Sequence, residues 1–509
     1  MARAPRREAS RHRGVGARDA MPTEPRVVAD WDELRTIVEQ GGSQWLVLEG
    51  TVRETSTVTV PLGSSVIVEG RDVHVVRSAQ RRQFDVAVGA SVTFSGSWTL
   101  EGERSALTGA AFACGAVGSH LCIRGAVAAV VPDAEPDEAT GCASLFQTAG
   151  ELILEEGARV SGWVVGRAQD PSASGAAIRV EGARARLTMR GGEVRDNVCV
   201  GLGEAPSPAV QVRDGAHFSL EGGAILDNNL TGTAAVNGGG VYLDEASLTM
   251  TGGRISHNAA YCGGGVYAVG DDPRRTLVSL LGGAIEGNAA QFIGGGVYAS
   301  GSLAVDGGEV LENAALYGGG IYNGDGVLAV SGGSIARNFA MSTQYAGGGV
   351  YIGRHGRLKG TGGTIEDNGC EGIGGGVYAK GETELAGTDV TGNLAQMGGG
   401  IANDRGEMML VAGVVEGNRA VTGGGVLNTG CVVITGGVIA QNRAVDAADD
   451  LCNHGGSLDL SLCDSVAWFP DAEGCRFSEE GAEREGPISL VPAALDGTLT
   501  LHAEVSVAA

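Results

Sequence analysis

Six tyrosines follow Gly-Gly-Gly-aliphatic segments in consecutive units of the sequence, and their type and spacing suggest binding. An aromatic ring can stack against a sugar or contact a protein partner. If each preceding aliphatic residue points inward, strand alternation places the tyrosines outside in one column. The alternative is that stacked tyrosines only stabilise a sheet. The candidate ligand-binding residues are Tyr242, Tyr267, Tyr298, Tyr322, Tyr351 and Tyr378.

Two charged segments offer groups that cleavage of a polysaccharide would use. A lyase requires a base that takes the proton α to a uronate carboxylate and a cation beside that carboxylate, whereas a glycosidase requires two carboxylates. Neither segment forms an acidic column, and solvated loops account for both, so the catalytic residues are unknown. The segments hold Asp271, Asp272, Arg274 and Arg275, and Arg354, His355, Arg357 and Lys359.

Two longer turns, at 231–240 and 339–349, are better placed for recognition, because loops on a rigid scaffold carry specificity. The alternative is that these longer turns are insertions that the fold tolerates and that have no role in binding. The 8 histidines lack ligand spacing, and Cys452, Cys463 and Cys475 lack the partners that zinc requires. No metal and no cofactor is predicted.

These residues lie on a repeat that can be written L-x-Φ-x-G-G-x-I-x-x-N-x-A, followed by a turn and G-G-G-V-Y. A β-branched aliphatic residue stands three positions before each Asn. Two positions after it stands Ala in most units, so Cys199 and Cys370 are interpreted as buried substitutes. The Asn column comprises Asn197, Asn228, Asn258, Asn288, Asn313, Asn338, Asn368, Asn393, Asn418 and Asn442.

The repeat predicts an all-β fold, a single-stranded right-handed parallel β-helix of the pectin-lyase-like kind. Apolar residues alternate with period two, which is typical of strands, and short strands must stack on their equivalents one coil away. The Gly pairs argue against a helical repeat. Stacked Asn side chains can form a ladder that satisfies the turn backbone. A short α-helix at Asp30–Gln40, with an N-cap and an apolar face, is predicted to cap the N-terminal end.

Four regions are expected along one domain. Residues 1–26 are Arg-rich and are interpreted as a disordered or misassigned extension, with Met21 as an alternative start; they lack the apolar segment of a signal peptide. Residues 27–144 form the cap and irregular opening coils, 145–450 the regular coils, and 451–509 the final coils and a C-terminal cap.

The net charge of the chain limits the classes of partner that it can be expected to bind. The 60 acidic and 36 basic residues give a net charge of −24, which argues against nucleic acid. No apolar run is long enough for a membrane span. A glycan or a cell-surface protein is the expected partner.

The Asn-x-Ala turn followed by Gly-Gly-Gly and a GGAI segment, present at Gly222–Ile225 and Gly282–Ile285, resembles the polymorphic membrane protein repeat of bacterial surface autotransporters. The resemblance covers about residues 187–450. This chain has mostly Val or Ile where the family's FxxN motif has Phe, and neither a signal peptide nor a C-terminal barrel is visible. The resemblance implies an extracellular or cell-surface location, while the chain itself leaves a cytoplasmic one open.

The predicted function is therefore a non-enzymatic, adhesin-like protein that presents an extended repetitive surface to a glycan or protein. The alternative is a polysaccharide lyase or glycosidase, since such enzymes share the fold; this is fold-level analogy. An enzyme needs charged groups that converge on adjacent coils, whereas a binder needs only an extended face. A purely structural rod is the third possibility.

Overall fold

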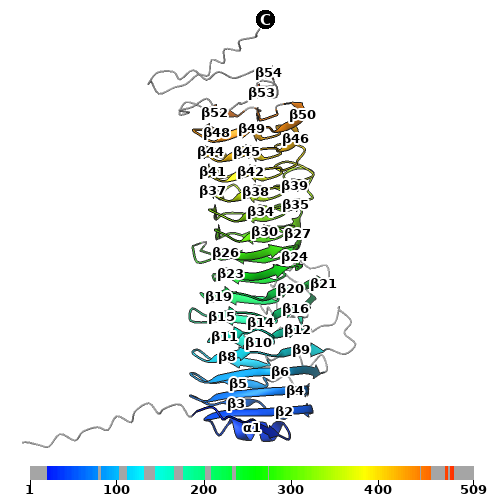
Figure 1. Cartoon of the computed structure of the whole chain (residues 1–509), viewed down its shortest axis with the longest axis vertical. Helices are drawn as coiled ribbons and strands as arrows, with labels where there is room; N and C mark the ends of the chain where they lie inside the picture. The colour runs from blue at the N-terminus through cyan, green and yellow to red at the C-terminus, as the bar shows by residue number, and fades with distance from the viewer. Residues whose placement is uncertain are drawn as a thin grey trace, which may run out of the picture.

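A computed structural model describes residues 20–77, 82–102, 112–130, 144–165, 176–200, 208–231, 237–272, 274–447, 449–454, 456–459, 476–479 and 482–485. Nearly all of its elements are strands, which stack in parallel into a β-solenoid of about 14 turns (Figure 1). The predicted parallel β-helix is thereby confirmed. One antiparallel pair, β53 with β54, stands apart from the parallel pairings of the described strands.

Most regular coils contribute two strands to sheet A, one to sheet C and one to sheet B, although β23 and β26 run through both sheet A positions and the Asn393 coil has only isolated bridges on the sheet C side. The two sheet A strands are separated by the Gly-Gly bend, as Gly307 and Gly308 separate β29 from β30. Each strand pairs with its equivalent one coil away, so that Val310 lies beside Ile335 and Tyr298 beside Tyr322. The register therefore aligns equivalent residues into columns along the rod.

Sheet A runs from the first to the last described coil. Its strands are β1 (Arg26–Val28), β2 (Ser43–Arg53), β4 (Ser65–Arg77), β6 (Ser91–Gly102), β8 (His120–Ile123), β9 (Ala126–Val130), β11 (Glu151–Leu154), β12 (Arg159–Ser161), β15 (Arg186–Met189), β16 (Glu193–Arg195), β19 (His217–Leu220), β20 (Ala224–Leu226), β23 (Ser247–Ser256), β26 (Leu277–Glu286), β29 (Ser302–Val305), β30 (Glu309–Leu311), β33 (Val327–Val330), β34 (Ser334–Ala336), β37 (Arg357–Gly360), β38 (Thr364–Glu366), β41 (Glu382–Ala386), β42 (Asp389–Thr391), β44 (Glu407–Ala412), β45 (Val414–Glu416), β48 (Cys431–Ile434), β49 (Val438–Ala440) and β52 (Ser457–Asp459).

Sheets B and C form the other sides of the coils. Sheet B holds β3 (Val58–Val60), β5 (Phe84–Val86), β7 (Ala113–Gly115), β10 (Phe146–Thr148), β14 (Ile178–Glu181), β18 (Val210–Arg213), β22 (Val241–Asp244), β25 (Val266–Val269), β28 (Val297–Ala299), β32 (Ile321–Asn323), β36 (Val350–Ile352), β40 (Val377–Ala379), β43 (Ile401–Asn403), β47 (Val426–Asn428), β51 (Leu451–Asn453), β53 (Arg476–Glu479) and β54 (Ala482–Glu485). On the sheet C side lie β13 (Val164–Val165), β17 (Val198–Val200), β21 (Asn229–Thr231), β24 (Ala259–Cys262), β27 (Ala289–Ile293), β31 (Ala314–Ala315), β35 (Phe339–Ala340), β39 (Gly369–Cys370), β46 (Arg419–Thr422) and β50 (Arg443–Ala447).

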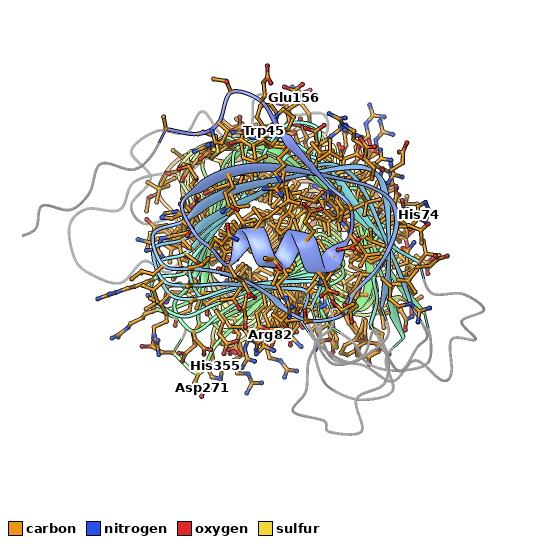
Figure 2. The ribbon with its side chains drawn as sticks, turned by 90° about the horizontal axis from the view of Figure 1, so that it is seen from below. Trp45, His74, Arg82, Glu156, Asp271 and His355 are labelled. Atoms are coloured by element: carbon orange, nitrogen blue, oxygen red, sulfur yellow. The ribbon has the colours of Figure 1, made fainter. Side chains whose placement is uncertain are left out.

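Helix α1 (Trp31–Val38) covers the N-terminal end of the solenoid, and Figure 2 shows it lying across the opening of the coils. The Asp30 side chain accepts a hydrogen bond from the Glu33 N–H, and the Glu33 carboxylate accepts one from Ala29. The first bond satisfies a backbone donor that the first turn leaves free, and the second holds the residue that precedes the N-cap. Trp31, Leu34 and Val38 are buried against the first coils. The predicted cap is confirmed, with slightly shorter bounds.

The aliphatic column fills the interior of the regular coils, as expected. Its ten residues are at most 2% exposed and belong to one continuous apolar core that spans the rod. In the opening coils, which lack the Asn column, Phe84, Phe94, Phe112 and Phe146 pack edge-on or tilted within the same core. Large rings thus fill coils whose sequence is less regular.

The predicted Asn ladder is present through all ten rungs. Each Nδ2 donates to the Oδ1 of the Asn one coil further, at 2.8–3.0 Å. The same Oδ1 also accepts the backbone N–H of the preceding Asn. The ladder ends in donors and acceptors of another kind: the Asn197 Oδ1 accepts from the Trp163 N–H, and Asn442 donates to Asp450.

Two features of the turns were not predicted. The residue before every ladder Asn has a left-handed backbone, with φ between 52° and 68°, including non-glycines such as His257 and Arg337. A second, shorter ladder joins Asn403, Asn428 and Asn453 at 2.8 and 2.7 Å. Its members follow sheet B aliphatic residues by two positions, at a spacing of 25, which is the signal that could have revealed it.

The expected regions belong to one continuous stack, because β7 pairs with β10 and β8 with β11 across residue 145. Residues 1–19 of the expected N-terminal extension lie outside the described residues. Of the expected final coils, β51 and β52 continue the stack, and most of 460–509 lies outside the described part.

Candidate binding surfaces

The six tyrosines form one continuous stack on the outer side of sheet B. Successive ring centroids are 5.6, 4.6, 5.6, 4.5 and 4.9 Å apart, and the first four pairs lie within 18° of parallel. The preceding aliphatic residues are buried in the main core, so the tyrosines point away from it. Because each ring face rests on its neighbour, a bound sugar could reach ring edges and hydroxyls but not the faces within the stack.

A second row of side chains covers part of this stack. Tyr317, Ile373 and Met397, which precede the Gly-Gly-Gly segments, pack against it in a small apolar cluster outside the main core. Tyr378 is fully buried and Tyr351 nearly so, whereas the other four tyrosines are half-buried. The alternation in the sequence predicted that the tyrosines point outward, but it did not predict that a second row of side chains packs over them.

Burial raises the pKa of the tyrosine hydroxyls, to about 12 for both Tyr242 and Tyr298. The pKa of Tyr378 is raised first by burial and then by its hydrogen bond to Asp404, whose Oδ2 accepts from the hydroxyl at 2.5 Å. Lys380 lies 4.3 Å above the Tyr345 ring and 3.9 Å from Asp404. The stack thus consists of neutral phenols, and at its Tyr378 end it contacts the ion pair of Lys380 and Asp404.

The two charged segments proposed for catalysis do not converge on one site. Asp271 and His355 are exposed and project from the same side of the rod (Figure 2), at corners three sheet B strands apart. The Asp272 carboxylate accepts from the Arg274 N–H, and Arg275 forms an ion pair with Glu245. Charged groups of the second segment also form ion pairs: Arg357 lies 2.9 Å from Glu382, and Lys359 lies 3.8 Å from Glu384.

Of the two longer turns, 339–349 is described throughout. Phe339, Met341 and Tyr345 expose 42%, 45% and 43% of their surface there, an apolar surface of the kind that can contact a partner. Residues 232–236 of the other turn lie outside the described residues. Recognition by these turns stays a prediction.

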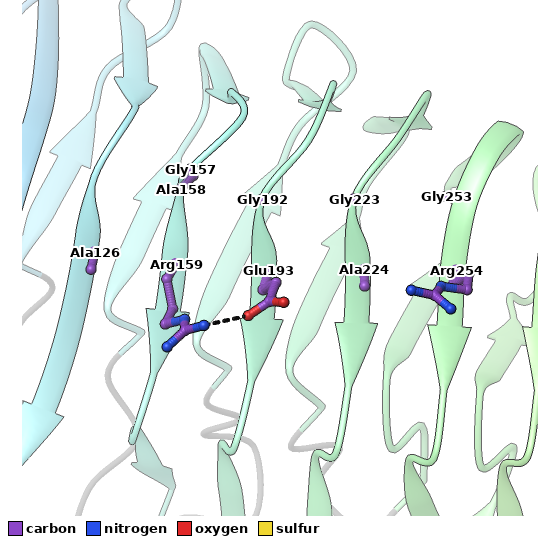
Figure 3. A pocket seen from close by; sticks show the side chains of 10 residues that line it. All are labelled: Ala126, Gly157, Ala158, Arg159, Gly192, Glu193, Gly223, Ala224, Gly253 and Arg254. Carbon is purple, nitrogen blue, oxygen red and sulfur yellow. Dashed lines mark hydrogen bonds and ion pairs between the residues drawn. The ribbon is translucent and has the colours of Figure 1, made fainter.

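A groove that the sequence did not predict lies over the bend of sheet A (Figure 3). Its volume is about 720 Å³, and its lining comes from five successive coils. It is lined by Ala126, Gly157, Ala158, Arg159, Gly192, Glu193, Gly223, Ala224, Gly253 and Arg254. With parallel strands about 4.8 Å apart, five rungs extend over roughly 19 Å along the rod.

Glycines make the floor of the groove. A Cβ on Gly192 would lie 2.5 Å from the carbonyl oxygen of Ala158, and one on Gly223 would lie 2.4 Å from that of Gly192. Because the bends stack this closely, only glycine fits at Gly192 and Gly223, and the floor of the channel holds no side chain larger than that of alanine. The repeated Gly pairs are the feature of the sequence that corresponds to this floor, but the shape of the groove depends on how closely the pairs stack.

Ion pairs between neighbouring coils build the walls. Arg159 contacts Glu193 at 2.9 Å, as the dashed line in Figure 3 marks, and Arg254 lies 3.8 Å from Glu286. Outside the lining of the groove, Arg190, which directly precedes Gly191, lies 3.2 Å from Glu155 and 3.8 Å from Glu221. All these side chains are substantially exposed, so the pairs contribute little to stability.

Metal-binding geometry is not found in the described part of the chain, where no group of three or more His, Cys, Asp or Glu residues could hold an ion. Cys122, Cys262, Cys370 and Cys431 are free thiols, and buried Cys370 packs among Ala340, Ala346 and Ala395, as the sequence predicted. Cys199 lacks a described side chain, and Cys463 and Cys475 lie outside the described residues. No helix among the described residues has the length and apolar character that crossing a membrane requires.

Comparison of the chain with models of known protein families, with curated proteins and with solved structures finds no match. The likeness to polymorphic membrane protein repeats therefore stays a prediction from the sequence motif.

Proposed function

We propose that this protein is a non-enzymatic, adhesin-like rod that binds a glycan or protein partner along one side, at the cell surface or outside the cell. The open groove over the sheet A bend carries the proposal. It offers a continuous channel across five coils, with the charged side chains of Arg159, Glu193 and Arg254 in its lining and a floor that the stacking holds rigid. A rigid concave surface of this kind reduces the entropy lost when an extended partner binds.

Lyase or glycosidase activity, the alternative, has less support from the same groove. A glycosidase uses a pair of carboxylates, and among the described residues that line the groove Glu193 is the sole carboxylate. A lyase needs a base, but an arginine keeps its proton in proteins, and Arg159 already contacts Glu193. Binding requires neither group to change its charge.

The test is incubation of the full chain with acidic and neutral polysaccharides and with a panel of cell-surface proteins. Retention on immobilised ligand, without new reducing ends or unsaturated uronate products, is the expected result. Turnover of any polysaccharide would replace the binding function by the enzymatic one. Turnover would also direct mutagenesis to Glu193.

A further inference from the structure

We infer that the groove over the Gly-Gly bend, lined by Arg159, Glu193 and Arg254, binds a neutral polysaccharide chain that lies along the axis of the rod. The inference rests on the proposed binding function and specifies its ligand class and its site. Three properties of the groove support it: its shape, its hydrogen-bonding capacity and its charge balance.

The shape favours an unbranched chain over a globular partner. The channel follows the column direction, because its lining residues occupy the same position of successive coils: Ala126 pairs with Arg159, which pairs with Glu193. The same column continues through Ala224 to Arg254. The floor presents glycine backbone and the small alanine side chains, against which the flat, weakly apolar face of a sugar ring can rest.

The walls retain donors and acceptors that suit hydroxyl groups. Arg159 uses one of its five N–H donors in its hydrogen bond to Glu193, and within the described part of the chain the others make no hydrogen bond. The Glu193 Oε1 likewise accepts none there. Arg254 approaches Glu286 at 3.8 Å, beyond hydrogen-bonding distance, and 65% of its side chain is exposed. Because sugar hydroxyls both donate and accept, they can bind to these groups without breaking the ion pairs.

The charge balance selects a neutral chain over a polyanion. The two arginines of the lining, Arg159 and Arg254, are each matched by a glutamate that they contact, Glu193 and Glu286 respectively. The groove therefore carries no excess of positive charge, and the chain as a whole carries −24. A polyuronate would have to displace glutamates from the arginines and approach against the overall field.

The experiment measures calorimetric binding of cellohexaose, xylohexaose and mannohexaose, with hexagalacturonate as the anionic probe, to the full chain. At least one neutral hexasaccharide is expected to bind, more tightly than hexagalacturonate and with an affinity that changes little with salt. Arg159→Ala combined with Glu193→Ala removes the wall pair without leaving an unpaired charge. We expect this variant to raise the Kd about tenfold or more.

The matched control is Arg357→Ala combined with Glu382→Ala. This pair has the same 2.9 Å separation and similar exposure, but it lies on sheet A outside the groove. Ala224→Tyr should block the channel, whereas Ser334→Tyr, at the same column position several coils away, should not. Circular dichroism checks that each variant keeps the fold.

The outcomes separate the inference from the function on which it rests. Neutral binding lost in the groove variants and kept in the controls supports the inference. Neutral binding that the groove variants retain overturns the groove assignment, and tighter binding of hexagalacturonate overturns the neutral ligand class; either result leaves the binding function standing. Failure of all four probes overturns the inference, and failure of the protein panel as well overturns the proposed function.

Discussion

The Asn ladder should contribute more stability per residue than a buried Asn outside it, and Asn313→Ala tests this. The Asn313 side chain accepts from the backbone N–H and the Nδ2 of Asn288, at 2.9 and 3.0 Å. It donates to the Asn338 Oδ1 and to the Ile285 carbonyl, at 3.0 and 2.9 Å. Truncation removes these four hydrogen bonds and leaves the buried Asn288 N–H without a partner, while the Asn288 Nδ2 keeps only its bond to the Ile255 carbonyl. At about 0.5–1.5 kcal/mol each, the loss is roughly 2–6 kcal/mol.

Asn323→Ala is the matched control. Asn313 and Asn323 are both fully buried, but the Asn323 Nδ2 makes two hydrogen bonds, to the carbonyls of Gly326 and Arg357, and its Oδ1 has no partner. Its removal should cost about half as much. Chemical denaturation gives the two losses, and hydrogen exchange should show faster exchange of the Asn288 amide in Asn313→Ala. If Asn313→Ala lost no more free energy of unfolding than Asn323→Ala, and the Asn288 amide stayed protected from exchange, cooperative stabilisation by the ladder would be refuted.

Further predictions concern the tyrosines, the thiols and the groove floor. Burial raises the pKa of Tyr298 to about 12, above the value of about 10 in an unfolded chain, so its stabilising effect should be complete below pH 10 and disappear as pH rises through 12. Alkaline denaturation of Tyr298→Phe should be correspondingly less steep; an unchanged profile would contradict this. Alkylation should modify half-buried Cys431 before buried Cys370, whose pKa burial raises to about 12, and equal rates would show that the turn opens readily. Gly223→Ala should destabilise more than Gly63→Ala in denaturant, since both glycines have positive φ but a Cβ meets open space only at Gly63.

The columns that the sequence predicted correctly are those in which one residue type repeats. The buried aliphatic column and the ten-rung Asn ladder follow from spacing alone, because parallel stacking places identical positions above one another. The second ladder was missed because it has three joined rungs near the end of the repeat. The cap was predictable from Asp30 and Glu33, whose spacing is that of a capping box.

The binding surfaces could be predicted only in part, because they depend on distances between coils. The sequence placed the tyrosines outside the core, but not their ring planes, which lie face to face in the first four pairs. Nor did it indicate that Arg159 and Glu193, 34 residues apart, would meet. Their contact depends on the register in which β12 pairs with β16. The groove likewise depends on how closely Gly192 and Gly223 stack.

The contrast between the predictable columns and the less predictable groove suggests where a stacked solenoid can bind a ligand. In a column of identical residues the side chains satisfy one another: the ladder amides bond along the axis, and the tyrosine faces rest on the next ring. Few groups remain for a ligand. In the column that runs through Ala126, Arg159, Glu193, Ala224 and Arg254, neighbours differ in size and charge, so space and unused donors remain between them. Recognition should therefore be concentrated where the repeat is heterogeneous, which favours the groove over the more regular tyrosine stack as the proposed binding site.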